Sequence, residues 1–192
     1  MQNLIFGTHR LQAAHIAIQL DEKDPYSQYA LAIISVFSDA LDQAVRAAEE
    51  AVEISPSFAL GYFVLGVGRL FSGNALGAID SFERALRLNP YDPQNFVFIQ
   101  LQALAYYFSD QIDKALQAAT RASKIRPTWL PTLETLAVCY ARLDRMEEAR
   151  ACVMQMLEIE KPKGDLLALL KKHNPQWAKA MAAMLRKASG QD

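Results

Sequence analysis

Three histidines, two cysteines and a short glycine run are the residues with which this chain could do chemistry. His9 and His15 are six residues apart, which places them on different faces of a helix, and His173 is distant from both. Cys139 and Cys152 form no Cys-x-x-Cys pair, and no histidine stands at zinc spacing from either. No nucleophile is grouped with a histidine and a carboxylate, so we expect no catalytic residue, no metal site and no cofactor.

The cysteines and glycines favour structural roles. We expect Cys139 and Cys152 to be small buried hydrophobic side chains in a reducing compartment, and a disulfide between them is the alternative. The run Gly66-Val67-Gly68, followed by Gly73, superficially resembles a phosphate-binding loop. No strand precedes it, and its spacing fits neither nucleotide motif, so we interpret Gly66 as a close helix contact.

Composition indicates a globular protein. The 192 residues are 52% hydrophobic and 21% charged, with a net charge of −1, which argues against disorder and against a general affinity for nucleic acid. The charge is uneven, because residues 1–160 are acidic on balance and residues 161–192 are basic. The basic tail is either a docking surface or the solvated outside of a capping helix. No signal peptide and no membrane-length apolar run is visible, so we expect a cytoplasmic protein.

Four segments repeat the same order of apolar residues. Each has a helical apolar stretch, a short turn and a second helical stretch. The leading alanines of the second stretches are 34, 37 and 34 residues apart: Ala44, Ala78, Ala115 and Ala149. The turns before them are Phe37-Ser38-Asp39, Phe71-Ser72-Gly73, Phe108-Ser109-Asp110 and Leu143-Asp144-Arg145. Prolines at 56, 90 and 127 cannot continue a helix, and one helical hairpin cannot bury its own apolar face, so the hairpins must stack.

The period and its small residues resemble the tetratricopeptide repeat. The second unit is the best match, through Tyr62, Leu65-Gly66, Ala78, Phe82, Ala85 and Pro90. The resemblance covers roughly residues 10–162. It implies an all-α, right-handed superhelix of helical hairpins that binds proteins. We divide the chain into a half-repeat or capping helix (1–24), four units (25–58, 59–92, 93–129 and 130–163) and C-terminal capping helices (164–192).

The third unit carries three extra residues, which we assign to Pro93–Asn95. We expect them to lengthen its first helix by about one turn. Asp24-Pro25 and Asp92-Pro93 have the residue types of a helix N-cap and first turn, and we predict that each begins a helix.

The two ends of the chain depart from the repeat. Residues 8–20 are spaced like the second helix of a unit whose first helix is missing or reduced to residues 2–6. We expect the chain to be the C-terminal piece of a longer protein, and the alternative is that an isolated capping helix happens to share the spacing. At the other end, Leu166–Leu170 and a helix starting at Asn174-Pro175 are expected to form a cap with a polar outside. This end also resembles the C-terminal repeat modules of bacterial class III adenylate cyclases and winged-helix transcriptional regulators.

The resemblance implies a binding groove, because the first helix of each tetratricopeptide unit lines the concave face. Carried over by position, the candidate partner-binding residues are Tyr29, Ile33, Phe37, Phe63, Val67, Phe71, Gln100, Leu104 and Phe108. The alternative is that many of them form the core between repeats. They are apolar or neutral, which argues against the clamp of Lys, Arg and Asn that grips a peptide carboxylate in some members of the family.

These observations predict a non-catalytic scaffold for protein–protein interaction. We expect its partner to be an amphipathic helix or an apolar peptide segment, and a second copy of the chain is one possibility. No nucleic acid or membrane partner is expected. The alternative is a regulatory or sensory module of a larger bacterial adenylate cyclase or transcriptional regulator.

Overall fold

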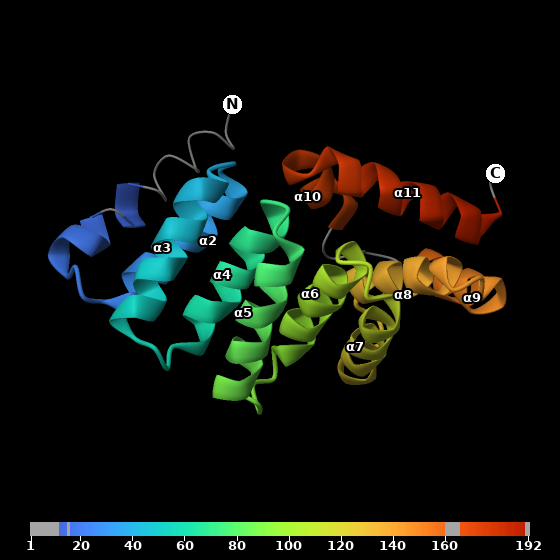
Figure 1. Ribbon diagram of the computed structural model, residues 1–192, viewed down its shortest axis with the longest axis horizontal. Coiled ribbons are helices and arrows are strands. Elements are labelled where there is room, and N and C mark those ends of the chain that lie inside the picture. The colour runs from blue at the N-terminus through green and yellow to red at the C-terminus, as the bar shows by residue number, and fades with distance from the viewer. Residues whose placement is uncertain (1–11, 15, 160–165, 191–192) are drawn as a thin grey trace. The chain divides into compact units, whose positions relative to one another are not determined.

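The computed structural model describes residues 12–14, 16–159 and 166–190 (Figure 1). Within these ranges the chain forms helices joined by turns and contains no strand, which confirms the predicted all-α class. The chain divides into two compact units, residues 1–90 and residues 91–192.

Unit 1 contains two antiparallel helical hairpins. The first joins α2 (Pro25–Phe37) to α3 (Leu41–Ile54), and the second joins α4 (Ala59–Phe71) to α5 (Ala75–Leu88). The hairpins stack through α3 on α4 and α2 on α4. Residues 12–14 and 16–20 are also helical, and Ala14 and Ile18 pack against the core between α2, α3 and α4.

Unit 2 contains two further hairpins and a helical pair. The hairpins are α6 (Asn95–Phe108) with α7 (Ile112–Ile125), and α8 (Leu130–Arg142) with α9 (Met146–Leu157). They stack through α7 on α8 and α6 on α8. The chain ends in α10 (Leu166–His173) and α11 (Pro175–Ser189), and α11 packs on both α8 and α9.

The turn inside each hairpin has the same backbone geometry. One residue per turn has a positive φ, between 58° and 88°: Asp39, Gly73, Asp110 and Asp144. The next residue donates its N–H to a carbonyl five residues earlier, as in Ala40 to Ser35 and Asn74 to Arg69, both within 2.9 Å. This arrangement is a Schellman motif, which satisfies the last carbonyls of a helix. Asp and Gly are suited to these positions because they tolerate the left-handed conformation best.

The predicted proline stops are confirmed. Helices α3, α5 and α7 end two residues before Pro56, Pro90 and Pro127. The residue between helix and proline has φ near −137° in each case, because a proline pushes its predecessor out of the helical region.

Small residues bring the helices of each hairpin close together, as predicted. The leading alanines Ala44, Ala78, Ala115 and Ala149 are all fully buried. Gly66 of α4 faces Phe82 of α5 so closely that a Cβ atom on Gly66 would lie 2.6 Å from the ring. The glycine run is therefore a helix-packing feature, and not a phosphate loop.

Two expectations for the start of α6 are wrong. Asp92 does not cap the helix, because α6 begins at Asn95 and Asp92 instead accepts a hydrogen bond from the Gln94 N–H in the preceding turn. The extra residues do not add a helical turn, since α6 has 14 residues and α4 has 13. Two prolines within four residues keep this segment out of the helix, so the insertion lengthens the connection instead.

The predicted starts of α2 at Asp24-Pro25 and of α11 at Asn174-Pro175 are confirmed. Asp24 accepts hydrogen bonds from the N–H groups of Tyr26 and Ser27 and precedes Pro25 in the first turn of α2. Asn174 caps α11 in the same way by accepting from the Trp177 N–H at 3.2 Å.

Candidate protein-interaction surface

The candidate residues on α2 are partly open to solvent. Tyr29 is half-buried, with its ring 6.0 Å from that of Phe58, and burial raises the pKa of its hydroxyl. Ile33 packs against the core of unit 1 but is not fully covered. Phe37, at the end of the helix, is 66% exposed. This face of α2 therefore presents apolar surface to solvent.

The equivalent residues on α4 lie deeper. Phe63 is half-buried, and its ring lies 6.2 Å from that of Phe82 in the same hairpin. Val67 and Phe71 are buried, and Phe71 is only 1% exposed. Phe71 stands 34 residues after Phe37, so the side chain at this repeat position is exposed in the first hairpin and buried in the second.

In unit 2 the candidate residues of α6 form internal contacts. Gln100 is buried, and its amide lies 3.4 Å from the Pro131 carbonyl and from the Thr135 hydroxyl, to which it donates. Leu104 is fully buried. Gln100 therefore joins α6 to α8, and neither Gln100 nor Leu104 is exposed for a partner to contact.

Phe108 is covered by the C-terminal helix. Its ring stacks on that of Trp177 in α11, with centroids 4.0 Å apart and planes within 6° of parallel. The opposite end of α11 is held by Ala188, which packs with Ala141 and Ala149, and by Lys187, which lies 3.9 Å from Asp144. The repeat position of Phe108 is therefore covered by another part of the same chain.

The fourth hairpin places a charged residue at this repeat position. Arg142 stands 34 residues after Phe108, contacts Asp110 at 2.6 Å and lies over the ring of Tyr107. The ion pair with Asp110 raises the pKa of Arg142, and burial raises the pKa of Tyr107. Phe108 is therefore the last apolar residue at this repeat position.

Sequence reasoning missed a cleft of about 370 Å³ between α3, α4 and α5 of unit 1. Arg69 lies inside it and donates to Glu49 at 3.2 Å and to the Ser81 hydroxyl at 3.1 Å. Its other lining residues are Val52, Glu53, Tyr62, Leu65 and Asp80. The helical spacing of Tyr62, Leu65 and Arg69 on α4 was the signal that could have revealed it, since all three share one face.

The cysteines are free and buried, which confirms the structural interpretation. Burial raises the pKa of Cys139 to about 12 and also raises the pKa of Cys152. Thiols with raised pKa values are poor nucleophiles at neutral pH, because the reactive species is the thiolate.

The remaining candidates for chemistry show no grouping in the described part of the chain. There, no set of three His, Cys, Asp or Glu side chains is placed to hold a metal ion. His9, His15 and the apolar residues Leu4, Ile5 and Phe6 lie outside the described residues. None of the helices described is both long and apolar enough to cross a membrane.

Comparison with known proteins identifies the type of repeat. A family model described as anaphase-promoting complex, cyclosome, subunit 3 matches residues 73–156. No curated protein is significantly similar to the chain in sequence. Among solved structures, YrrB, described as a tetratricopeptide repeat protein with an unusual peptide-binding site, is 18% identical over 94% of both chains, with a TM-score of 0.66.

The fold is an all-α helical solenoid of the tetratricopeptide-repeat type. Two other structures share this tetratricopeptide-type fold. MamA is 20% identical over 77% of this chain and 85% of its own, with a TM-score of 0.67. The Cut9–Hcn1 hetero-tetramer of the anaphase-promoting complex matches 97% of this chain and 38% of its own, at 13% identity and a TM-score of 0.73. At these identities the tetratricopeptide-type fold is shared, and the partners named belong to those proteins.

Proposed function

We propose that this chain is a non-catalytic protein-interaction scaffold that binds a partner helix or apolar segment on the first helices of its hairpins. Folds of stacked helical hairpins present extended surfaces on which proteins and peptides bind. YrrB, with its peptide-binding site, and the Cut9–Hcn1 assembly support this class of function.

The exposed apolar face of α2 and the stack of Trp177 on Phe108 together carry the proposal. Phe37 and Phe108 end the first helix of their hairpins and stand at the same repeat position. Trp177 stacks on Phe108, whereas Phe37 is 66% exposed. An aromatic ring from an amphipathic helix is thus an established occupant of this position within the chain itself. We infer that the partly exposed apolar face of α2, formed by Tyr29, Ile33 and Phe37, contacts an apolar or aromatic side chain of a partner.

Burial also reduces the number of candidate groove residues that a partner could contact. Val67, Phe71, Gln100 and Leu104 are buried and contribute to the core, so the proposed contact centres on α2. The side chains there are apolar or aromatic, which favours an apolar ligand over a terminal carboxylate.

A pull-down with the immobilised full chain, read by mass spectrometry, tests this proposal. We expect Phe37→Asp to lose the proteins that the wild type captures, because the substitution places a charge in an apolar contact without disturbing the core. Leu157→Asp is the matched control, since Leu157 is an apolar residue of 76% exposure on the second helix of its hairpin. Equal capture by the two variants contradicts the proposal.

The alternative function, a regulatory module within a larger bacterial protein, stays a prediction. One observation supports it. Ala14 and Ile18 pack on unit 1 as the second helix of a preceding unit does in this type of fold. The coding sequence upstream of Met1 decides between the two, because a cyclase or winged-helix domain there would establish the larger protein.

A further inference from the structure

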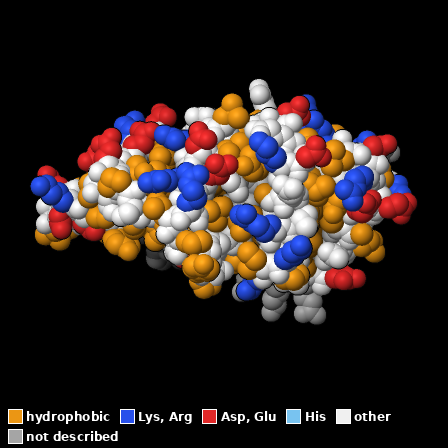
Figure 2. Space-filling view, turned by 60° about the horizontal axis from the view of Figure 1, so that its bottom comes forward, with side chains coloured by type: hydrophobic (Ala, Val, Ile, Leu, Met, Phe, Trp, Pro, Cys, Tyr) orange, Lys and Arg blue, Asp and Glu red, His pale blue; other side chains and the backbone are white. Residues whose placement is uncertain are grey.

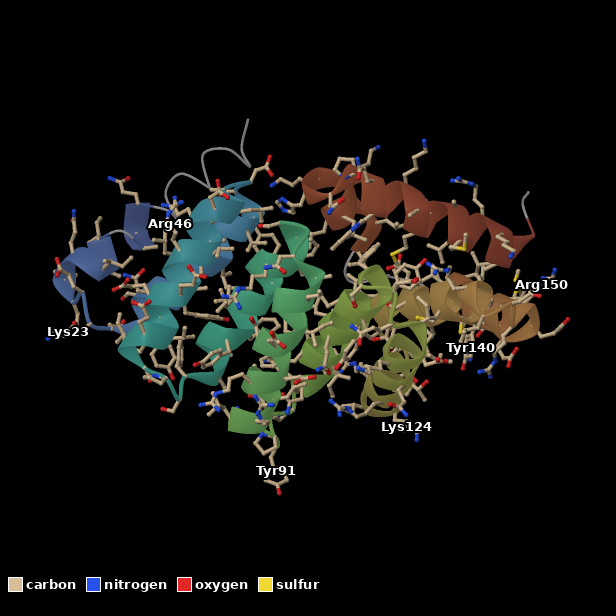
Figure 3. The ribbon with its side chains drawn as sticks, in the orientation of Figure 1. Lys23, Arg46, Tyr91, Lys124, Tyr140 and Arg150 are labelled. Carbon is tan, nitrogen blue, oxygen red and sulfur yellow. The ribbon has the colours of Figure 1, made fainter. Side chains whose placement is uncertain are left out.

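One face of unit 1 carries an excess of negative charge. Its exposed carboxylates make no ion pair within the described part of the chain, and we call them the acidic face: Asp42, Glu50 and Glu53 of α3 and Asp80 of α5. The three on α3 are 8 and 3 residues apart and share one side of the helix. Arg46, which is labelled in Figure 3, is the one cation on that side of α3 and lines a shallow pocket together with Glu50. In Figure 2 acidic side chains lie over the N-terminal part of the face shown, with Lys and Arg side chains among them.

The cleft beside the acidic face has an apolar floor. Val52, Tyr62 and Leu65 line it, and Glu53 and Asp80 belong to both the cleft and the acidic face. Its internal cation, Arg69, is already held by Glu49 and Ser81. Arg84 lies to one side, over the Tyr62 ring at 5.8 Å. Apolar surface bordered by carboxylates suits lysine and arginine side chains, which bury an aliphatic stem and keep the charged end at the rim.

The C-terminal helices of unit 2 carry the opposite charge. Residues 166–190 contain five Lys or Arg residues and no Asp or Glu. Lys179 and Arg186 of α11 are exposed and form no ion pair in the described ranges, and we call them the basic face. Lys171 of α10 is exposed and without an ion pair there as well. Lys179 and Arg186 are seven residues apart and share one side of α11, which leaves the apolar residues Trp177 and Met181 to pack inward.

We propose that the basic face of one copy of this chain binds the acidic face of a second copy. Each chain carries both faces, and each face holds charges that its own unit leaves unpaired. Bringing them together adds attraction between copies, which offsets the like-charge repulsion within each face. The contact joins unlike surfaces, so each copy can bind two others. This inference does not depend on the apolar contact at α2.

Light scattering on the purified full chain tests the association directly. We expect the average mass to rise with protein concentration at about 0.01 M salt and to fall to that of the monomer at about 1 M salt, where charges are screened beyond ~3 Å. A monomer at every concentration in low salt overturns the proposal, and so does an assembly that is equally stable at high salt.

Charge reversal then locates the contact. We expect Glu50→Lys with Glu53→Lys, and separately Lys179→Glu with Arg186→Glu, each to weaken association roughly tenfold or more, because each creates like charges across the contact. The control is Arg121→Glu with Lys124→Glu on α7, which makes the same change of charge on another helix of unit 2 (Figure 3). Association should survive in the control, and its loss there to the same extent contradicts the assignment.

Mixing the two reversed variants is the decisive measurement. In one variant both faces are positive, and in the other both are negative, so each should be monomeric alone. In the mixture the faces are complementary again, and we expect the association to return. All four substituted positions are exposed, and circular dichroism checks that the variants remain folded. A mixture that stays monomeric shows that the two faces do not meet.

Discussion

At the scale of single residues, the close approach of α4 and α5 depends on one missing side chain. A Cβ atom at Gly66 would lie 2.6 to 2.9 Å from three ring carbons of Phe82, which is fully buried. Real Cβ atoms do not approach other atoms so closely, and a ring packed on all sides has little room to move. By comparison, a Cβ atom at Gly68 would meet the Val45 side chain at 3.0 Å.

We expect Gly66→Leu to destabilise the protein by ~1–3 kcal/mol or more, because overpacking a well-filled core forces strain on its neighbours. Denaturant unfolding followed by circular dichroism measures the change. Gly66→Ala should lower the free energy of unfolding less when the protein also carries Phe82→Leu. The smaller side chain at position 82 leaves room for the added methyl group. A midpoint for Gly66→Leu equal to that of the wild type would falsify the proposed packing.

At the scale of elements, α11 serves as the closing helix of unit 2. Its N-terminal end is held by the stack of Trp177 on Phe108, and its C-terminal end by Ala188 against Ala141 and Ala149. Met181, between them, is fully buried. The helix thereby covers apolar surface of the last hairpins, which the end of a solenoid must do to stay soluble.

The stack between Phe108 and Trp177 should be measurable as a pairwise coupling. In a double-mutant cycle with Phe108→Ala and Trp177→Ala, we expect a coupling of ~0.5–1.5 kcal/mol, the range for aromatic pairs beyond their burial. The comparison variant is Trp177→Phe, which keeps a ring at the position and should retain most of the stability. Strict additivity of the two alanine substitutions is the result that contradicts a stack in solution.

At the scale of the whole molecule, the chain separates into two units at the connection between α5 and α6. This connection carries the three extra residues, and Tyr91 within it is 94% exposed and points away from the protein (Figure 3). Pro93 and Gln94 are exposed as well. Exposed connections with few contacts are where proteases cut folded proteins first.

Limited proteolysis with a protease of broad specificity should therefore cut first within residues 89–94. The expected products are two fragments, one ending near Pro90 and one beginning near Tyr91, and mass spectrometry of early time points identifies them. The shorter connections at residues 55–58 and 126–129 serve as internal controls within the same digest. Earlier cleavage at either of them contradicts the division into two units.

The repeat could be predicted from local residues alone. Proline excludes itself from a helix, alanine and glycine permit close contact, and Asp or Gly accepts the left-handed turn, so each hairpin is determined within about 34 residues. The residue pattern predicted the wrong start for α6 at Asp92-Pro93. The three-residue insertion next to it belongs to the connection between α5 and α6 and not to the helix. The residue types of a cap do not reveal which of two adjacent turns they occupy.

The sequence by itself thus determined the class of fold, the turns, the proline stops and the structural roles of Gly66 and the cysteines. Tertiary structure alone decided which candidate groove residues face solvent. Phe37, Phe71 and Phe108 have the same local context, yet one is exposed, one is core and one is covered by Trp177, about 70 residues further along the chain. Their difference arises from which helix packs next to each, and that is a contact between segments distant in sequence.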